Sequence, residues 1–187
     1  TDLFARICGY FDQAGFSILD AKIHTAKNGY ALDTFQVVTS LLPEHYRELI
    51  GSLSPERFHV YITGTAEEGE QLRGQLPMNA SHVSDVTGKL SLAELITLVG
   101  SCNVLVAAST GPLHIAAALD VVTVGVYSSA PPIHAGRWAP LGKFAEALED
   151  RHAPTTGSLV IPAEEVKQCW EKGYLRKKQQ RKSRKKN

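Results

Sequence analysis

The residues with the clearest capacity for chemistry form one block, ASTGPLHIAAAL, from Ala108 to Leu119. Two hydroxyl residues, a glycine, a proline and a histidine come directly after the apolar run 104–108 and directly before a helical pattern of small residues. In a parallel α/β sheet, ligands bind beyond the carboxyl ends of the strands, which is where such a block would lie. The block therefore predicts a site for a phosphate or a sugar.

Each side chain of the block suits an anionic or hydroxylated ligand. Thr110, with Ser109 beside it, offers a hydroxyl, and Gly111 lets the backbone come close to a ligand. Pro112 at the first helical position leaves the neighbouring N–H groups free to face an anion. His114, one turn into the helix, can hydrogen-bond a phosphate or a sugar hydroxyl.

The alternative interpretation of the block is purely structural. Thr110 would then only cap the helix, and His114 would pack against the next strand. Because capped turns between a strand and a helix are common, the block by itself does not decide between the two interpretations.

Strand and helix patterns alternate around this block. Short loops separate them between residues 58 and 127, and two of the helices begin with a capping-box sequence. Such alternation is typical of a Rossmann-like α/β fold, a parallel sheet with flanking helices. The expected strands are 58–63, 82–86, 104–108 and 122–127, the expected helices are 65–75, 91–99, 112–119 and 162–172, and residues 131–150 are expected to form a Pro/Gly-rich loop.

The first fifty residues follow a different pattern. We predict an incomplete helix–hairpin–helix unit over residues 1–50 and an α/β domain over residues 51–175, joined by a turn-rich stretch that begins at Gly51. The elements expected in the first unit are a helix over 2–12, hairpin strands over 17–25 and 30–39 around an Asn28-Gly29 turn, and a helix over 43–50.

The composition suits a protein of the cytoplasm. Hydrophobic residues make up 43% and charged residues 21% of the chain, and no run approaches the roughly 18 apolar residues of a membrane span. The three cysteines lie far apart without a C-x-x-C pair, and the seven histidines include no i, i+4 pair. We therefore expect a cytoplasmic protein, either free or peripheral to the inner membrane, with no metal site and no cofactor.

The charge is unevenly distributed along the chain. Residues 176–187 hold eight basic residues and no acid, whereas the rest of the chain holds 12 basic and 19 acidic residues. We predict a disordered tail over 176–187. Two interpretations of this tail remain open: a solvated segment, or an electrostatic contact with an anionic membrane surface or a nucleic acid.

Several blocks resemble, in the right order, the C-terminal half of the heptosyltransferase-like glycosyltransferases (family 9), which have the two-domain GT-B fold. The order of these blocks over residues 58–148 makes the resemblance specific. The blocks are ITGTAEE at 62–68, DVTGKLSLAEL at 85–95, STGPLH at 109–114 and IHAGRWAPLG at 133–142.

The resemblance implies a nucleotide-sugar ligand. In this family the C-terminal half binds the sugar donor, so an ADP-heptose-like donor used in lipopolysaccharide or cell-envelope sugar transfer is expected. The residues that the resemblance assigns to the donor are Ser109, Thr110, Gly111 and His114 at the phosphates or the sugar, and Glu67 or Glu68 at the ribose.

This sequence departs from the family pattern in several places. The family usually has an aspartate where Ser109 stands and a glycine where Asp120 stands. The strand and loop that hold the diphosphate have no counterpart before Phe58, and the acceptor domain that supplies the catalytic base has none in this chain. Since the acceptor hydroxyl needs a base, we expect donor binding without sugar transfer by this chain alone, and we assign no catalytic residue.

The first fifty residues resemble an ACT domain of the bacterial uridylyltransferase/uridylyl-removing enzyme. The resemblance implies an effector site near Asp20 and a homo-oligomer that pairs through its ACT-like sheets, while a solvated strand face around Asp20 is the alternative. The matching stretches are LFARI at 3–7, ILDAKIHT at 18–25 and NGYALDTF at 28–35.

Two unrelated fragments therefore meet near Gly51, and we interpret the chain as a fusion or a recombined chimera. We expect the ACT-like hairpin to add strands to an edge of the α/β sheet. Two other functions stay open: an ACT-type regulatory module that binds a small effector such as glutamine, and a chimera with no small-molecule activity.

Overall fold

The structure is a computed structural model of the 187-residue chain. It describes residues 17–25, 31–38, 40–41, 43–128, 134–150, 158–159 and 161–184. The helix predicted over 2–12 and the Asn28-Gly29 turn lie outside these residues.

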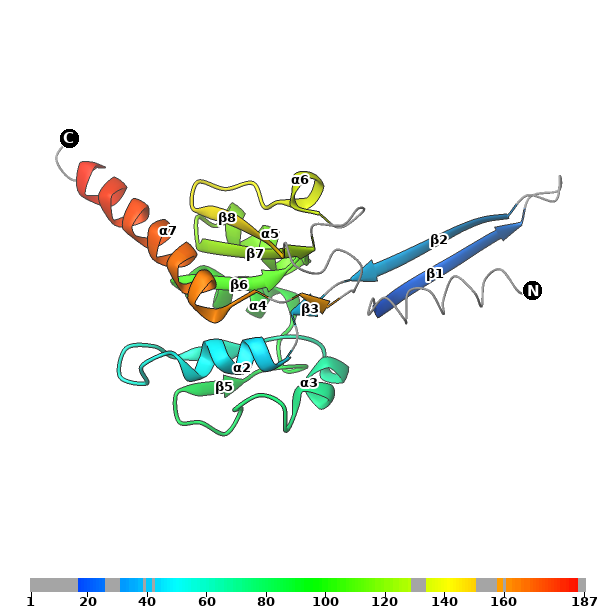
Figure 1. The fold of residues 1–187 in the computed structure, drawn as a ribbon, viewed down its shortest axis with the longest axis horizontal. Helices are drawn as coiled ribbons and strands as arrows, with labels where there is room; N and C mark the ends of the chain where they lie inside the picture. The colour runs from blue at the N-terminus through cyan, green and yellow to red at the C-terminus, as the bar shows by residue number, and fades with distance from the viewer. Residues whose placement is uncertain are drawn as a thin grey trace.

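A parallel three-stranded sheet forms the centre of the α/β body (Figure 1). Its strands, in spatial order, are β6 (Val104–Ala108), β7 (Val122–Ser128) and β8 (Ala145–Asp150). Central β7 is buried on both faces, as a parallel strand covered by helices must be. Its valines 122, 124 and 126 share a core cluster with helix α7 (Ala163–Arg184), whereas Gly125 faces Leu113 of helix α5 (Gly111–Ala118).

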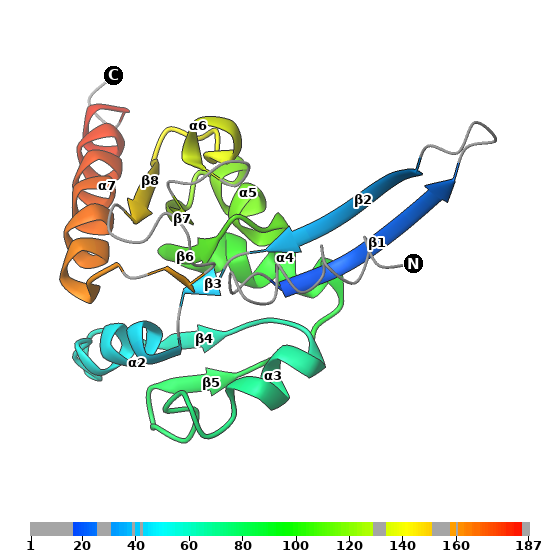
Figure 2. The same cartoon turned by 45° about the vertical axis from the view of Figure 1, so that its right-hand side comes forward.

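A smaller parallel sheet lies beside the first. It pairs β4 (Val60–Ile62) in parallel with β5 (Val83–Asp85), and Figure 2 shows the two strands side by side below the first sheet. Helix α3 (Ala66–Leu72) follows β4, and helix α4 (Leu92–Ser101) precedes β6. The predicted Rossmann-like arrangement of parallel strands and flanking helices is confirmed.

The hairpin forms as predicted, but it does not extend the α/β sheet. Strand β1 (Ser17–Thr25) pairs antiparallel with β2 (Ala31–Val38), and among the strands that the structure describes the two pair only with each other. Our expectation of added edge strands was therefore wrong. Two antiparallel strands satisfy the hydrogen bonds of their inner edges within the pair and form without a further sheet edge. The segment that pairs with the body is β3 (Ser40–Leu41), which lies parallel to β9 (Ser158–Leu159).

Helix α2 (Pro43–Gly51), which the sequence analysis assigns to the first unit, packs into the α/β body. Its Leu49 belongs to the same buried cluster as Val166 and Trp170 of α7. The ring of Tyr46 packs against this cluster, and burial raises the pKa of Tyr46 to about 12. The α/β body therefore includes residues 43–50, which precede the predicted joint.

The loop predicted over 131–150 contains two regular elements. A short helix, α6 (Ala135–Trp138), follows β7, and β8 completes the sheet. The sequence of β8, AEALED, has weak strand propensity because alanine and glutamate are depleted in strands. Parallel pairing with β7 from Thr123↔Ala145 to Ser128↔Asp150 overrides that local preference.

The prediction of a disordered tail was wrong for residues 176–184, because α7 continues to Arg184. Contacts with the body hold the middle of this helix. Arg176 forms an ion pair with Glu146, and Lys177 Nζ donates a hydrogen bond to the carbonyl of Asp120 at 2.5 Å. Positive side chains also interact favourably with the carboxyl end of a helix. None of the helices in the described part of the chain is long and apolar enough to span a membrane.

Asp120 ends α5 in a strained conformation. Val121 N–H donates to the Ala116 carbonyl and Asp120 N–H to the Ala117 carbonyl, at 3.0 and 3.2 Å, and these two bonds form a Schellman motif. The motif requires a left-handed residue at Asp120, whose φ is 57°, and glycine adopts that conformation without strain.

Replacing Asp120 with glycine is therefore expected to stabilise the fold by about 0.5–1 kcal/mol. Glycine removes the strain of the left-handed conformation, which stabilises the fold. Part of this stabilisation is offset, because glycine raises the conformational entropy of the unfolded chain. Urea unfolding measures the net gain, with Asp120→Ala as the matched control. Alanine retains the Cβ, so a gain of equal size with alanine would contradict this explanation.

Candidate functional site

The predicted donor block forms the turn between β6 and α5. Thr110 occupies the N-cap position with extended backbone angles, but its side chain makes no capping hydrogen bond. Gly111 and Pro112 are the first two helical residues, so Pro112 stands at the second position and not at the first. His114 is exposed on the first turn. The purely structural interpretation of the block requires Thr110 to cap the helix and His114 to pack against the next strand. The structure shows neither contact.

The hydroxyl of Ser109 is engaged beneath this turn. It hydrogen-bonds the phenol of Tyr127, a fully buried residue of β7. The Tyr127 hydroxyl in turn donates to the backbone carbonyl of Trp138 in α6 at 2.6 Å, and burial raises the pKa of Tyr127 to about 12. Tyr127 thus connects the β6–α5 turn to α6, a role that the sequence analysis missed. The glycine at position 125, two residues earlier on the same strand face, could have indicated this role from the sequence, because the absence of a side chain there leaves room for the Tyr127 ring.

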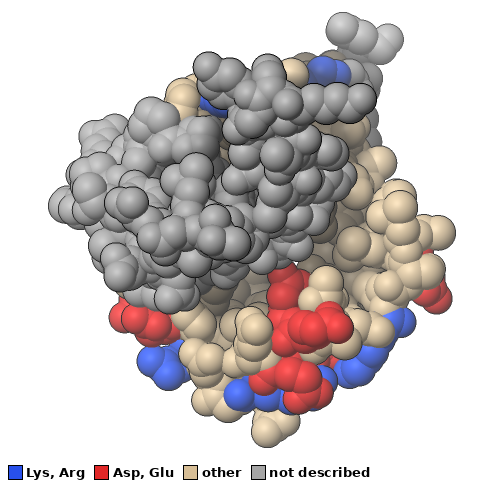
Figure 3. Space-filling view, turned by 90° about the vertical axis from the view of Figure 1, so that its right-hand side faces the viewer, with Lys and Arg blue, Asp and Glu red and all other residues tan. Residues whose placement is uncertain are grey.

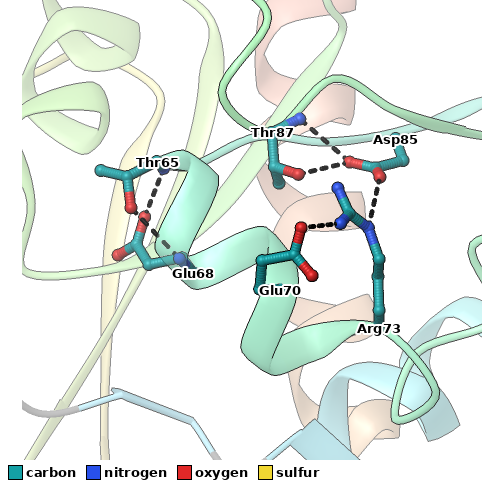
Figure 4. A network of polar contacts seen from close by, with 6 residues as sticks. All are labelled: Thr65, Glu68, Glu70, Arg73, Asp85 and Thr87. Carbon is teal, nitrogen blue, oxygen red and sulfur yellow. Dashed lines mark hydrogen bonds and ion pairs between the residues drawn. The ribbon is translucent and has the colours of Figure 1, made fainter.

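The two glutamates predicted at the ribose have different surroundings at the start of α3 (Figure 4). Thr65 N–H donates to Glu68 Oε2 at 2.6 Å, and Glu68 N–H donates to Thr65 Oγ1 at 3.2 Å, which completes a capping box. Glu67 is exposed and lies outside this box. Because Glu68 already satisfies the helix terminus, Glu67 is the freer of the two carboxylates for a ligand.

A polar network fixes α3 against the end of β5 (Figure 4). Thr87 donates from its backbone N–H and its hydroxyl to Asp85 Oδ1, at 3.0 and 2.6 Å, and these bonds hold the pKa of Asp85 below its usual value. Arg73 bridges Asp85 and Glu70. Gly69 makes the close approach possible, since a Cβ there would lie 2.1 Å from Thr87 Oγ1.

The parallel topology places the turn at residues 109–114 and the start of α3 on the same side of the molecule, beyond the carboxyl ends of β6 and β4. Figure 3 views this side and shows acidic and basic side chains interspersed below the grey atoms. None of the residues predicted to contact the diphosphate is lysine or arginine. An anion at this turn would therefore depend on the Gly111 N–H at the start of α5 and on His114, since Pro112 has no N–H and the Leu113 N–H donates to the Thr110 carbonyl.

The remaining predicted residue, Asp20, lies on a different sheet. It pairs with Gln36 in the β1–β2 hairpin, next to an irregularity in the register. Its role as an effector ligand stays a prediction.

Two open grooves lie elsewhere on the α/β body, and neither includes residues 109–114. One, of about 870 Å³, runs between β8 and α7, and the other, of about 430 Å³, lies between β8 and α6. In the second groove Ala135 N–H donates to Glu149 Oε1 at 2.9 Å. The grooves share Ala147, Leu148 and Glu165.

The sequence model of glycosyltransferase family 9 (heptosyltransferase) matches residues 40–162, about two thirds of the chain. The chain belongs to glycosyltransferase family 9. The match begins before the predicted joint at Gly51, in agreement with the packing of α2 into the α/β body.

Two solved heptosyltransferases share the fold of this family 9 chain. Escherichia coli heptosyltransferase WaaC, in a structure with ADP, is 26% identical with a TM-score of 0.59, over 70% of this chain and 39% of that protein. The E. coli ADP-heptose lipopolysaccharide heptosyltransferase II is 22% identical with a TM-score of 0.59, over 73% of this chain and 42% of that protein, and shows the fold alone. The chain thus spans about two fifths of the length of these structures.

The predicted resemblance of the first fifty residues is also confirmed. The bifunctional uridylyltransferase/uridylyl-removing enzyme of Ralstonia nicotianae is 64% identical over 53 residues, which is 26% of this chain and 6% of that enzyme. The corresponding enzyme of Cupriavidus pinatubonensis is 55% identical over 58 residues. Similarity to two unrelated proteins supports the interpretation of the chain as a chimera.

Proposed function

We propose that this family 9 chain binds a nucleotide-sugar donor of the ADP-heptose type at the β6–α5 turn. The observation that carries the proposal is the state of that turn, where the Thr110 hydroxyl is not used as a cap and His114 is exposed. At the start of this eight-residue helix the Gly111 N–H is the one that suits a phosphate, because Pro112 has no N–H and the Leu113 N–H donates to the Thr110 carbonyl.

The proposed roles follow from the surroundings of each residue. The Gly111 N–H, the Thr110 hydroxyl and the His114 ring bind the diphosphate or the sugar. Glu67 accepts hydrogen bonds from the ribose hydroxyls. Ser109 acts indirectly, because its hydroxyl is hydrogen-bonded to Tyr127 and fixes the base of the turn.

ADP is the probe of choice for this site. The 26% identical E. coli WaaC structure contains ADP, and the proposed contacts involve the nucleotide as well as the sugar. We expect the chain alone to bind ADP and ADP-heptose without transferring the sugar, and we place its origin in lipopolysaccharide or cell-envelope sugar transfer.

The double variant Thr110→Ala/His114→Ala is expected to weaken ADP binding about 30-fold, since each lost contact contributes about 1 kcal/mol. Isothermal titration calorimetry measures the change. The matched control is Thr97→Ala/His59→Ala, two exposed residues of the same types outside the turn, which should leave ADP affinity unchanged.

Two results would argue against the proposal. Saturable ADP binding that the Thr110/His114 variant leaves intact would place the nucleotide elsewhere. Binding of glutamine without binding of ADP would favour the regulatory-module hypothesis, and binding of neither would favour a chimera without small-molecule activity.

A further inference from the structure

Helix α7 has one face that packs against the body. Its members are Val166, Cys169, Trp170 and Gly173, all buried. Gly173 allows close contact with β7, because a Cβ there would lie 2.8 Å from Val122 Cγ1. One turn later, Lys177 lies 5.7 Å from the ring centre of Phe144.

The flank of the helix next to this packed face carries a different set of residues, which we call the basic face of α7. Tyr174, Lys178, Arg181 and Lys182 are spaced i, i+4, i+7 and i+8, so they lie on one side of the helix, with Leu175 at its border. All five are exposed, Tyr174 by 47% and Leu175 by 56%. Tyr174 and Leu175 are both exposed to solvent and are followed directly by basic residues, and Leu175 also lines the groove between β8 and α7.

We propose that the basic face of α7 docks the protein on an anionic lipid bilayer. Lysine and arginine attract acidic headgroups, and their long stems let the charges reach the headgroups while the helix lies along the surface. Tyr174 and Leu175 suit the boundary between headgroups and acyl chains, where an aromatic ring with a hydroxyl and a neighbouring leucine can both be accommodated. The end of α7 extends beyond the sheet in Figure 1, and the side chains of this face are exposed.

The apolar pair favours a bilayer over a nucleic acid. Phosphate backbones attract the same three basic residues, but Leu175 gains nothing from a phosphate. No aromatic residue follows Tyr174 in the sequence, so the face lacks the succession of rings on which single-stranded bases stack. The inference goes beyond donor binding, because none of these residues belongs to the proposed donor site.

Co-sedimentation of the full chain with lipid vesicles tests the proposal. We expect binding to vesicles of mixed phosphatidylglycerol and phosphatidylcholine, and little binding to phosphatidylcholine alone. Lys178→Gln/Lys182→Gln should lower the partition coefficient about 30-fold. The control Arg47→Gln/Lys143→Gln removes the same charge from exposed sites on the body and should change it by less than about twofold.

A second variant separates the bilayer from a nucleic acid. Tyr174→Ser/Leu175→Ser retains every charge and should weaken vesicle binding while leaving any binding of polyuridylate unchanged. Circular dichroism of each variant checks that α7 remains helical.

Three outcomes would overturn the proposal. The first is that the chain does not bind the anionic vesicles. The second is that the Lys178/Lys182 variant and its control lose the same fraction of the partition coefficient. The third is that Tyr174→Ser/Leu175→Ser leaves vesicle binding unchanged. Tighter binding of polyuridylate than of anionic vesicles would overturn it in favour of a nucleic acid.

Discussion

Replacing Gly125 with valine is expected to destabilise the fold by about 3 kcal/mol. A Cβ at this position would lie 2.6 Å from Tyr127 Cε2 and 3.0 Å from Leu113 Cδ2. The ring of Tyr127 cannot move aside at low cost, because it is fully buried and its hydroxyl is held by the Trp138 carbonyl. Chemical unfolding in urea, followed by circular dichroism, measures the loss.

Gly51→Val is the matched control for this substitution. A Cβ at Gly51 meets nothing within 4 Å, and the residue is exposed at the end of α2. The control should change the free energy of unfolding by about 0.5 kcal/mol or less. If Gly125→Val were equally mild, the Tyr127 ring would have an alternative position, and its connection between the β6–α5 turn and α6 would not be rigid.

Replacing Gly111 with valine is expected to abolish most donor binding while leaving the fold intact. A Cβ at Gly111 meets nothing within 4 Å, so the valine side chain occupies open space at the start of α5. In the proposed complex that space lies between the helix N-terminus and the diphosphate. We expect ADP affinity to fall about 100-fold, equivalent to about 2.7 kcal/mol.

Two measurements on the same sample make this result specific. Calorimetry gives the ADP affinity, and thermal unfolding should give a melting temperature close to that of the unmodified chain. The Gly51→Val control should bind ADP normally. Unchanged ADP affinity in Gly111→Val would refute a close approach of the ligand to this backbone, and a large loss of stability would show that the position is not open.

The sequence predicted those parts of the fold that depend on local interactions. The starts of α3 and α4 follow from two capping boxes, in which Thr65 and Ser91 exchange hydrogen bonds with residues three positions later. The hairpin and the helix that follows it were also predicted, as was the alternation of parallel strands and helices. Each of these signals is contained within a few neighbouring residues.

Part of the site could have been assigned more sharply from sequence. The TAEE motif already places Glu68 at the third helical position of a capping box, which leaves Glu67 as the freer carboxylate. The left-handed conformation of Asp120 was likewise indicated by the glycine that the family usually has there.

Other features depend on residues far apart in the chain, and only the tertiary structure decided them. Strand β8 forms on the edge of β7 despite its weak propensity, and α7 continues through the basic segment from a first half anchored in the core. The Ser109–Tyr127–Trp138 connection joins the β6–α5 turn, β7 and α6, which are far apart in the sequence, so no local sequence pattern predicts it. Sequence alone determined the elements whose signals are local, such as the capped starts of α3 and α4, because local hydrogen bonding and hydrophobic period encode them, and the order of its motif blocks indicated the family. The tertiary structure decided which polar groups are already satisfied, because burial and long-range contacts exist only in the folded chain.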